Sequence, residues 1–509
     1  MEEAREKQLR AVLPLLGGAA SDSERLAGLL IVARLAEKAP EETLGAIFAA
    51  LSHDFVDRLL TSNAPAGSDT SPLQLASVAL AMLSALGTSP LIASHESFAA
   101  RLSAVARVGP AADLTLSMAQ DALGVFASAL SHDAGRRRVR DPLVASWLLG
   151  LCGVPSVQSS EELMSSWLNV ISPLLLDDEF VSANRGALLT AMCTLVELAE
   201  PLSNAFKFVL IDGCARIASV TAPSVEDLPP RSLASLRVTL RGAMLSRLPA
   251  SHRGDLLCFT GALLRGPSGL AWLPADDISF ILATFQLAVV EVRVLVEDER
   301  RDAARVERVL PSALDIVLAV VRSLSSSDEG RLTLTGDRLD AVQRSLDAAF
   351  GGIVDVMADE GPALNDAPHG GAACMRALAA YLAVETGFSD ARAAAIERVM
   401  PLIVGQARED REKADMFAPF FDNATADERL VDAFMDAGGA AVVSDAVVRD
   451  LRAADAAHEP RQSTITLLAA LLNIVVAPPQ AAYEGSAVVT AAMPLADLLP
   501  HIGTTRGVR

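Results

Sequence analysis

The chain has 509 residues, a formal net charge of −20 at pH 7, and 51 % hydrophobic residues, of which few are aromatic. So acidic a chain repels phosphate backbones, which excludes nucleic acid as a main partner and favours partners with basic segments. Because the apolar residues are mainly Leu, Ala and Val, the composition favours helices over strands.

Helix starts and stops can be read along the chain. The stretches Ser21–Glu24 and Ser159–Glu162 have the spacing of a capping box, in which a Ser hydroxyl and a Glu carboxylate satisfy free backbone N–H groups. Glycines at positions 17–18, 67, 87 and 266 are typical of helix ends. Proline suits the first turn of a helix, and this position is predicted for Pro40, Pro72, Pro142 and Pro201.

Two stretches show helical periodicity most clearly, because apolar residues recur at steps of three and four and so share one face of a helix. The first covers residues 233–248, with Leu233, Leu236, Leu240, Met244 and Leu248. The second covers residues 339–357, with Leu339, Val342, Leu346, Phe350, Ile353 and Met357. We therefore expect amphipathic helices at both places.

The intervals between stops predict roughly 22 to 26 helices joined by short loops. Helical hairpins with one apolar face cannot bury that face alone, and stacking them buries it. The sequence therefore predicts an all-α fold, an armadillo/HEAT-like right-handed superhelical solenoid of stacked helix pairs. Residues 1–500 are predicted to form a single continuous solenoid, and residues 501–509 a frayed C-terminal tail.

The five cysteines lie far apart in apolar stretches without CxxC spacing, which predicts buried reduced thiols and neither a disulfide framework nor a zinc site. The N-terminal residues resemble no leader peptide. The longest apolar runs, residues 280–290 and 465–476, fall short of the roughly 18 residues of a membrane span. We expect no transmembrane segment and a cytoplasmic location.

No catalytic motif is recognised in the sequence. No histidine pair has metal-ligand spacing, and no phosphate-binding or nucleophile motif is present. The acidic clusters precede or open predicted helices, where carboxylates favour the positive end of the helix dipole. We therefore predict a protein that is not an enzyme, without a catalytic residue, cofactor or metal.

Two charged groups allow two interpretations each. The basic run Arg136–Arg140 is either a solvated helix start or loop, or a site for an anion or an acidic partner. Glu291 follows a mostly apolar run, so it needs a charged or hydrogen-bonding partner, and Arg293 can pair with Glu297 one turn later. These residues are either a structural ion pair between stacked helices or a polar spot on a binding surface.

Four stretches resemble the neurochondrin family, in the order and approximate spacing of that family over residues 10 to 405. They are Ser23–Ala33; Phe55–Thr61, with Pro65 and Gly67 after it; Trp272–Pro274, followed by Val290–Arg293; and Leu378–Thr386, leading to Met400–Leu402. The resemblance implies an armadillo-type superhelix and a cytoplasmic adaptor without enzymatic activity. Relatives in animals are linked to neurite outgrowth, to restraint of a calmodulin-dependent kinase, and to binding of receptor tails and of signalling or trafficking proteins.

This chain departs from the animal members of that family in two ways. The paired N-terminal cysteines that carry palmitoyl groups have no counterpart, since the first cysteine is Cys152, and this argues against a lipid anchor. The composition is also rich in Ala and Arg, unlike that of an animal member. In a source without neurons, only the adaptor role would transfer.

By this match, one group of residues is predicted to form a binding or structural polar patch: Arg58, Glu291, Arg293, Glu385 and Thr386. A second group is predicted to pack: Phe55, Leu59, Leu60, Trp272 and Pro274. The leading hypothesis is a protein-interaction scaffold. The alternative is an acidic solenoid adaptor or transport receptor that binds basic peptide segments, although three tryptophans are few for the Trp/Asn ladder of peptide-binding armadillo proteins.

Overall fold

The structure is a computed structural model, which divides the chain into two compact units, Met1–Ala243 (unit 1) and Met244–Arg509 (unit 2). The single continuous solenoid over residues 1–500 stays a prediction. The tail at 501–509 lies outside the described residues. These are residues 2–17, 20–36, 39–61, 72–108, 114–274, 277–297, 302–325, 332, 334, 336–360, 368–384, 390–454 and 461–476.

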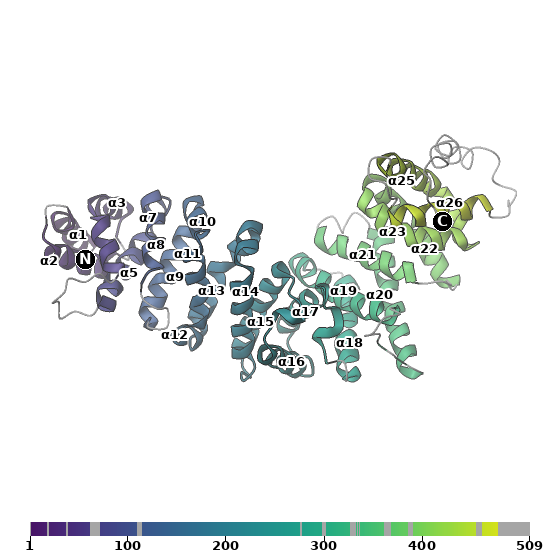
Figure 1. Ribbon diagram of the computed structural model, residues 1–509, viewed down its shortest axis with the longest axis horizontal. Helices are drawn as coiled ribbons and strands as arrows, with labels where there is room; N and C mark the ends of the chain where they lie inside the picture. Colours follow the sequence, from purple (N-terminus) through teal and green to yellow (C-terminus); the bar gives the residue numbers. More distant parts are fainter. Residues whose placement is uncertain are drawn as a thin grey trace. The chain divides into compact units, whose positions relative to one another are not determined.

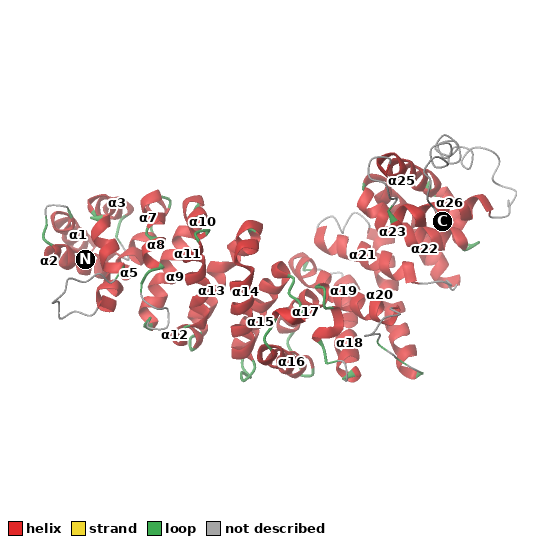
Figure 2. Cartoon of the chain, viewed as in Figure 1, coloured by secondary structure: helices red, strands yellow, loops and turns green. Residues whose placement is uncertain are grey.

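The described residues form helices and contain no strand (Figures 1 and 2), which confirms the predicted all-α class. The helices of unit 1 are α1 (Glu2–Leu16), α2 (Asp22–Leu35), α3 (Glu41–Ala50), α4 (His53–Leu60), α5 (Pro72–Gly87), α6 (Pro90–Ala93), α7 (Glu96–Ala100), α8 (Leu102–Val105), α9 (Leu116–Leu130), α10 (Asp133–Val139), α11 (Pro142–Gly150), α12 (Pro155–Gln158), α13 (Glu161–Ile171), α14 (Asp178–Ala199), α15 (Phe206–Thr221) and α16 (Pro230–Met244), whose last residue lies at the unit boundary. Short 3-10 helices are η3 (Leu151–Gly153), η4 (Ser172–Leu176) and η5 (Val225–Asp227).

Unit 2 contains longer helices and one 3-10 helix, η6 (Gly269–Trp272). The helices are α17 (Ala250–Arg265), α18 (Ile278–Glu297), α19 (Ala303–Ser325), α20 (Asp337–Glu360), α21 (Pro368–Val384), α22 (Asp390–Glu409), α23 (Arg411–Ala426), α24 (Leu430–Asp436), α25 (Gly439–Ala454) and α26 (Gln462–Val476).

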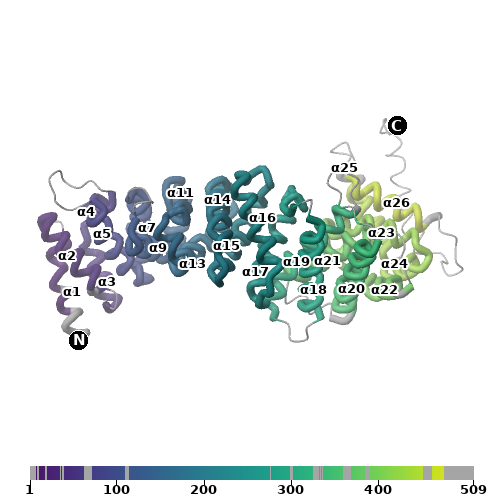
Figure 3. The backbone as a smooth tube through the Cα atoms, turned by 90° about the horizontal axis from the view of Figure 1, so that it is seen from below, coloured from purple at the N-terminus to yellow at the C-terminus, as the bar shows by residue number. Residues whose placement is uncertain are grey.

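Each unit is a stack of two helix layers. In unit 1, α2, α5, α9, α13 and α15 contact one another in succession, and α3, α6, α7, α10, α11 and α14 form the second row. In unit 2, α17, α19, α21, α23 and α26 form one row, and α18, α20, α22 and α24 the other, while α25 packs on α26 (Figure 3). A helix therefore packs on its counterpart in the next repeat, as expected for an armadillo/HEAT-type solenoid. The handedness predicted for the superhelix stays a prediction.

The two periodic stretches form the expected helices. In α20 the predicted stripe is buried from Val342 to Met357, whereas Leu339 in the first turn remains exposed. In α16 the residues Leu236 and Leu240 are buried, but the helix ends at Met244 and so excludes Leu248. Leu248 is also kept out of a helix by Pro249, because proline disfavours helical geometry in the residue before it.

The caps agree with the sequence at some positions and not at others. Ser21 and Glu24 form the predicted capping box at the start of α2. At α13 the cap is Ser160, whose hydroxyl accepts a hydrogen bond from the Leu163 N–H at 3.3 Å, so the predicted box at Ser159–Glu162 is wrong. The prediction for Pro201 is also wrong, because this residue follows α14 and the next helix begins at Phe206.

Helix α18 is long and apolar enough, by length and composition alone, to cross a membrane, with a mean hydropathy of 1.9. The apolar run 280–290 lies within this helix, which continues through Glu291 and Arg293 to Glu297. Half of the apolar window is buried within the structure, and a core helix passes the same test. Its length is thus weak support for a membrane span.

Candidate functional site

Arginine–carboxylate pairs connect helices of neighbouring repeats throughout the described part of the chain. The partners are separated by 36 residues in Arg58–Asp22 and by 53 residues in Arg308–Asp255, with most other pairs in between. This separation matches the roughly 40 to 47 residues of an armadillo or HEAT repeat. Further pairs of this kind are Arg101–Asp57, Arg185–Asp227, Arg265–Asp315, Arg392–Asp347 and Arg461–Asp415. Most of these arginines thus hold repeats together.

Arg58 lies on α4 in unit 1 and is one of these pairing residues. Its Nη2 donates to both carboxylate oxygens of Asp22 at 3.2 and 3.3 Å, and its guanidinium lies 5.5 Å from the centre of the Phe55 ring. The side chain is 54 % exposed. Beneath it, Phe55, Leu59 and Leu60 are buried and pack into the unit.

Glu291 lies on α18 in unit 2 and is fully buried, with an exposed fraction of 0 %. Its Oε2 accepts a hydrogen bond from Arg253 Nε of α17 at 3.1 Å, and its Oε1 accepts one from Arg305 of α19. The charged partners expected for Glu291 are therefore two arginines from two helices. A fully buried carboxylate that joins three helices serves packing and does not present a surface patch.

Arg293, two residues further along α18, points to solvent and pairs with Glu297 at 2.9 Å, which is the expected spacing of one helical turn. Trp272 in η6 is buried, and Pro274 in the following loop is half-buried. Glu291 is therefore not on an exposed surface, and Arg58 belongs to unit 1, so the patch as a whole stays a prediction. Glu385 and Thr386 lie outside the described residues.

The basic run lies in and just after helix α10. Arg136 pairs with Asp133 at 2.7 Å, Arg137 with Glu96 of α7 at 2.7 Å, and Arg140 with Asp177 at 2.7 Å and with Glu179. Three of its four arginines therefore pair with carboxylates of the same unit.

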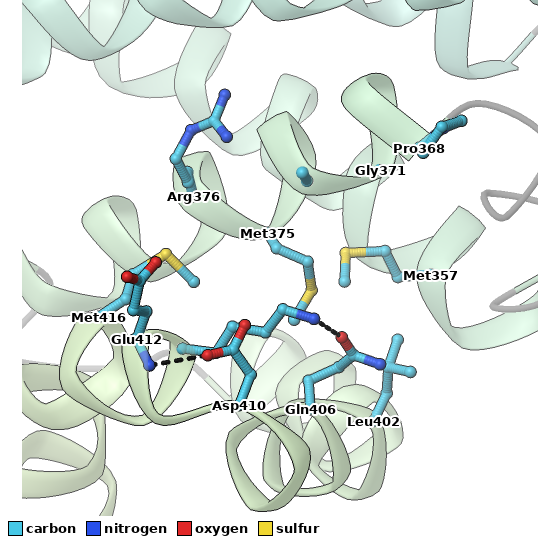
Figure 4. Close-up of a pocket in the computed structure, with 12 residues that line it drawn as sticks. Met357, Pro368, Gly371, Met375, Arg376, Leu402, Gln406, Asp410, Glu412 and Met416 are labelled. Carbon is cyan, nitrogen blue, oxygen red and sulfur yellow. Dashed lines mark hydrogen bonds between the residues drawn. The ribbon is translucent and has the colours of Figure 1, made fainter.

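A cleft of about 490 Å³ in unit 2 is the strongest candidate for a binding site (Figure 4). Its apolar part consists of Met357 of α20, Met375 of α21 and Met416 of α23, which point toward one hollow from three helices. Leu402 of α22 adds to this floor. We call it the methionine cleft. Its other lining residues are Pro368, Gly371, Ala372, Arg376, Gln406, Asp410, Glu412 and Lys413.

The walls of the methionine cleft carry charges of both signs. Arg376 lies on α21 with its guanidinium pointing away from the three methionines, and Asp410 and Glu412 stand at the start of α23 (Figure 4). The Asp410 carboxylate caps α23, where it accepts a hydrogen bond from the Glu412 N–H at 2.9 Å. Lys413 donates to the amide oxygen of Gln406. The cleft thus combines an apolar floor with a polar rim.

A second cleft of about 630 Å³ lies in unit 1, between α5, α9 and α13. It is lined by small and uncharged side chains apart from Arg136, which is paired with Asp133. Gln120 and Asn169 are exposed amides on two of its helices. Because it presents few features that distinguish one ligand from another, it is the weaker candidate.

The described residues hold no group of three or more His, Cys, Asp or Glu that could bind a metal ion. Burial raises the pKa of the Cys152 thiol to about 12 and raises that of Cys214 well above its ordinary value. Thiols with raised pKa values carry little thiolate and are poor nucleophiles. These two cysteines are therefore packing residues.

The sequence pattern does not predict the methionine cleft. Met357 was assigned to a buried stripe, and Met375 and Met416 carry no local pattern that separates them from core residues. The three residues come together only because their helices stack.

Comparison with known proteins places the chain in a family. The family model described as Neurochondrin matches residues 3–507. No curated protein matches the sequence. The solved structures that it resembles include an engineered protein with 16 % identity and a TM-score of 0.41, where 98 % of this chain and 95 % of that chain are covered.

Two natural proteins are also among the similar structures. The myosin chaperone UNC-45 from C. elegans has 13 % identity and a TM-score of 0.24 over 98 % of this chain, and a mutant of Kap121p has 11 % identity and a TM-score of 0.26 over 97 % of it. This chain spans 65 % of the length of each. Because these TM-scores are low, the assignment of the fold rests on the helix contacts and not on these two structures. The family match covers nearly the whole sequence, and the chain belongs to the neurochondrin family.

Proposed function

We propose that the protein is a non-enzymatic cytoplasmic adaptor that binds a segment of a signalling or trafficking protein in the methionine cleft. The observation that carries this proposal is the convergence of Met357, Met375 and Met416 on one hollow. Methionine side chains are unbranched and polarisable, so they adapt to partners of different shape and are used at promiscuous binding surfaces. A cleft of about 490 Å³ also falls within the range of known ligand sites.

The absence of enzymatic activity is part of the proposal, and the distribution of titratable groups supports it. In an active site, titratable groups with strongly shifted pKa values would lie together in a cleft. Among the described residues, burial raises the pKa of Asp57 and of Asp315, whereas the hydrogen bond from Arg185 lowers the pKa of Asp227 to about 2. All three carboxylates lie in arginine pairs between helical elements.

The test is affinity purification from native lysate with a variant that fills the cleft. Ala372 is exposed on the α21 wall, so Ala372→Trp places an indole in the opening without disturbing the core. Ala441→Trp on α25 is the matched control, because Ala441 is also exposed on a helix of unit 2 and does not line the cleft. Partners recovered with wild type and Ala441→Trp should be lost with Ala372→Trp. Equal recovery with both variants would contradict the proposal.

A second candidate function is binding of basic peptide segments, which the net charge of −20 favours. Glu428, Asp432 and Asp436 are exposed at every fourth position in and before α24, so they share one face. Binding of a lysine-rich peptide should then weaken steeply as salt rises, because screening reduces attraction between exposed charges. Affinity that is independent of salt would remove this candidate.

A further inference from the structure

The second cleft, in unit 1, lies on three helices that carry almost no charge. Helix α5 has no charged residue, α9 has only Asp121, and α13 has only Glu161 and Glu162 in its first turn. None of these three carboxylates lines the cleft, and Arg136, which does, is paired with Asp133 at 2.7 Å. In a chain in which 21 % of the residues are charged, the described lining of this cleft therefore offers a ligand no unpaired charge.

Much of the accessible lining of this cleft consists of short side chains. Helix α9 contributes Gly124 and Ala127, and its neighbours contribute the hydroxyl groups of Ser84 and Ser166. A Cβ at Gly124 would lie 2.7 Å from the Ser84 Oγ, so α5 and α9 already approach closely at this point. Short side chains let the backbone of a ligand come near the helices. The larger apolar lining residues are buried and form the floor: Leu123, Leu130, Leu163 and Val170.

Two carboxamides line the cleft on neighbouring helices, Gln120 on α9 and Asn169 on α13. Both side chains are exposed, and neither amide forms a hydrogen bond with another of the described residues. A carboxamide can donate to a C=O group and accept from an N–H group at the same time. These are the two groups that almost every residue of a main chain presents. The two amides therefore match the polar groups of a peptide backbone.

The same amides distinguish between the conformations of a bound segment. A helix satisfies its own backbone. A helix laid over the cleft would therefore cover Gln120 and Asn169 without pairing their main-chain-like groups, and a polar group that is buried without a partner costs free energy. An apolar ligand would have the same disadvantage. An extended segment instead presents N–H and C=O groups along its length, and these can pair with the amides.

We infer that the second cleft binds an extended, uncharged polypeptide segment through its main chain. Helices α5, α9 and α13 lie side by side (Figure 3). Packed helices are about 8 to 10 Å apart and an extended chain advances about 3.3 Å per residue, so a segment that crosses them meets a new helix roughly every three residues. Gln120 and Asn169 then bond different residues of the segment. This site lies in the other unit from the methionine cleft, so the inference does not rest on the proposed function.

The experiment uses a pool of peptides of about eight residues with blocked ends, in which each position is Ala, Ser, Thr, Val, Glu or Lys. Peptides of this length are too short to form a stable helix in water. Immobilised full-length protein retains the peptides that bind, and mass spectrometry identifies and quantifies them. A second pool has the same sequences with N-methyl groups on alternate backbone nitrogens. It has lost main-chain N–H donors and has kept its side chains.

The test variant combines Gln120→Met with Asn169→Leu, because these changes approximately keep the size of each side chain and remove its amide. The matched control combines Gln8→Met with Asn204→Leu. Gln8 and Asn204 are also exposed in unit 1, and neither lines the cleft. The two variants therefore differ in the place of the lost amides and not in the kind of change.

We expect the test variant to retain about tenfold less of the unmethylated pool than its control, because at least two hydrogen bonds are lost. Wild type should retain about tenfold less of the methylated pool, and the peptides that depend on the two amides should be depleted in Glu and Lys. Equal retention by the two variants, equal retention of the two pools, enrichment in Glu or Lys, or no retention by wild type would each overturn the inference. Ala372→Trp should leave retention unchanged, and loss of retention in this variant would place the peptides in the methionine cleft and overturn the inference as well.

Discussion

Two arginine–carboxylate contacts, one in each unit, have the same chemistry but differ in how far they are buried. Arg58 and Asp22 of unit 1 are separated by 36 residues and are 54 % and 55 % exposed. Arg253 and Glu291 of unit 2 are separated by 38 residues, and the carboxylate is fully buried. Exposed pairs contribute about 0 to 1 kcal/mol, whereas loss of one partner from a buried pair costs about 3 to 5 kcal/mol. Burial, and not residue type, therefore decides which contact matters.

The largest effect is expected for Glu291→Gln. The change removes the negative charge between Arg253 and Arg305 and should destabilise α17 to α19 by about 3 kcal/mol. Hydrogen exchange measured helix by helix is the appropriate method, because a chain with two units need not unfold in one step. Glu297→Gln on the same helix is the control and should change protection by less than about 0.5 kcal/mol. Equal losses in the two variants would remove the distinction between buried and exposed pairs.

Gly261→Ala should have the next largest effect, because it acts on the helix contact that encloses Glu291. A Cβ at Gly261 of α17 would lie 2.4 Å from the carbonyl oxygen of Ser312 in α19, so the two backbones would have to separate. We expect a loss of about 2 kcal/mol, visible as faster exchange in α17 and α19.

Gly45→Ala in α3 of unit 1 is the matched control for this change, since its Cβ would meet nothing within 4 Å. It should stabilise unit 1 by about 0.5 kcal/mol, because alanine loses less conformational freedom on folding than glycine does. Destabilisation by both substitutions would show that the close approach of α17 and α19 does not explain the effect of Gly261→Ala.

Acid should weaken unit 1 through His53. Desolvation, followed by the charge of Arg101 and the neighbouring His95, lowers the pKa of His53 below 6.5, while Asp54 opposes the shift. A histidine with a lowered folded-state pKa contributes stability above pH 6.5, and that contribution is lost as the pH falls through the folded-state pKa. The protection of amides in α3 and α4, relative to the intrinsic exchange rate at each pH, should therefore fall with acidity.

His53→Phe should reduce this dependence on pH, since a phenyl ring can keep the edge contact with Phe48, 5.1 Å away in the native pair, and cannot take up a proton. His369→Phe is the control, because His369 is 83 % exposed and belongs to unit 2. An unchanged slope in the His53 variant would assign the acid sensitivity of unit 1 to other groups.

Arg58→Ala should have the smallest effect. The ion pair with Asp22 is half-exposed, so we expect a loss of less than about 1 kcal/mol, and less again at high salt. Protection of α2 and α4 at two salt concentrations would measure it. A loss as large as that of Glu291→Gln would mean that exposure is a poor guide to the strength of these pairs.

Much of the secondary structure could be predicted because its causes are local. The stripe from Val342 to Met357 defines α20, and the capping box at Ser21 starts α2. The errors at Ser159, Pro201 and Leu248 concern helix ends, where alternative caps and turns differ little in energy. The candidate site could not be predicted in the same way, because no local pattern links Met357 to Met416.

The sequence by itself determined the class of the protein. Its apolar periodicity and its helix-ending glycines and prolines require helices that must stack. Four stretches resemble the neurochondrin family, and the family model that matches residues 3–507 assigns the chain to it. The tertiary structure decided which charges are buried. Glu291 and Arg293 are two residues apart, yet one lies between Arg253 and Arg305 and the other faces solvent. The reason is physical: periodicity fixes the face of a helix on which a side chain lies, whereas the neighbouring helices decide what that face meets.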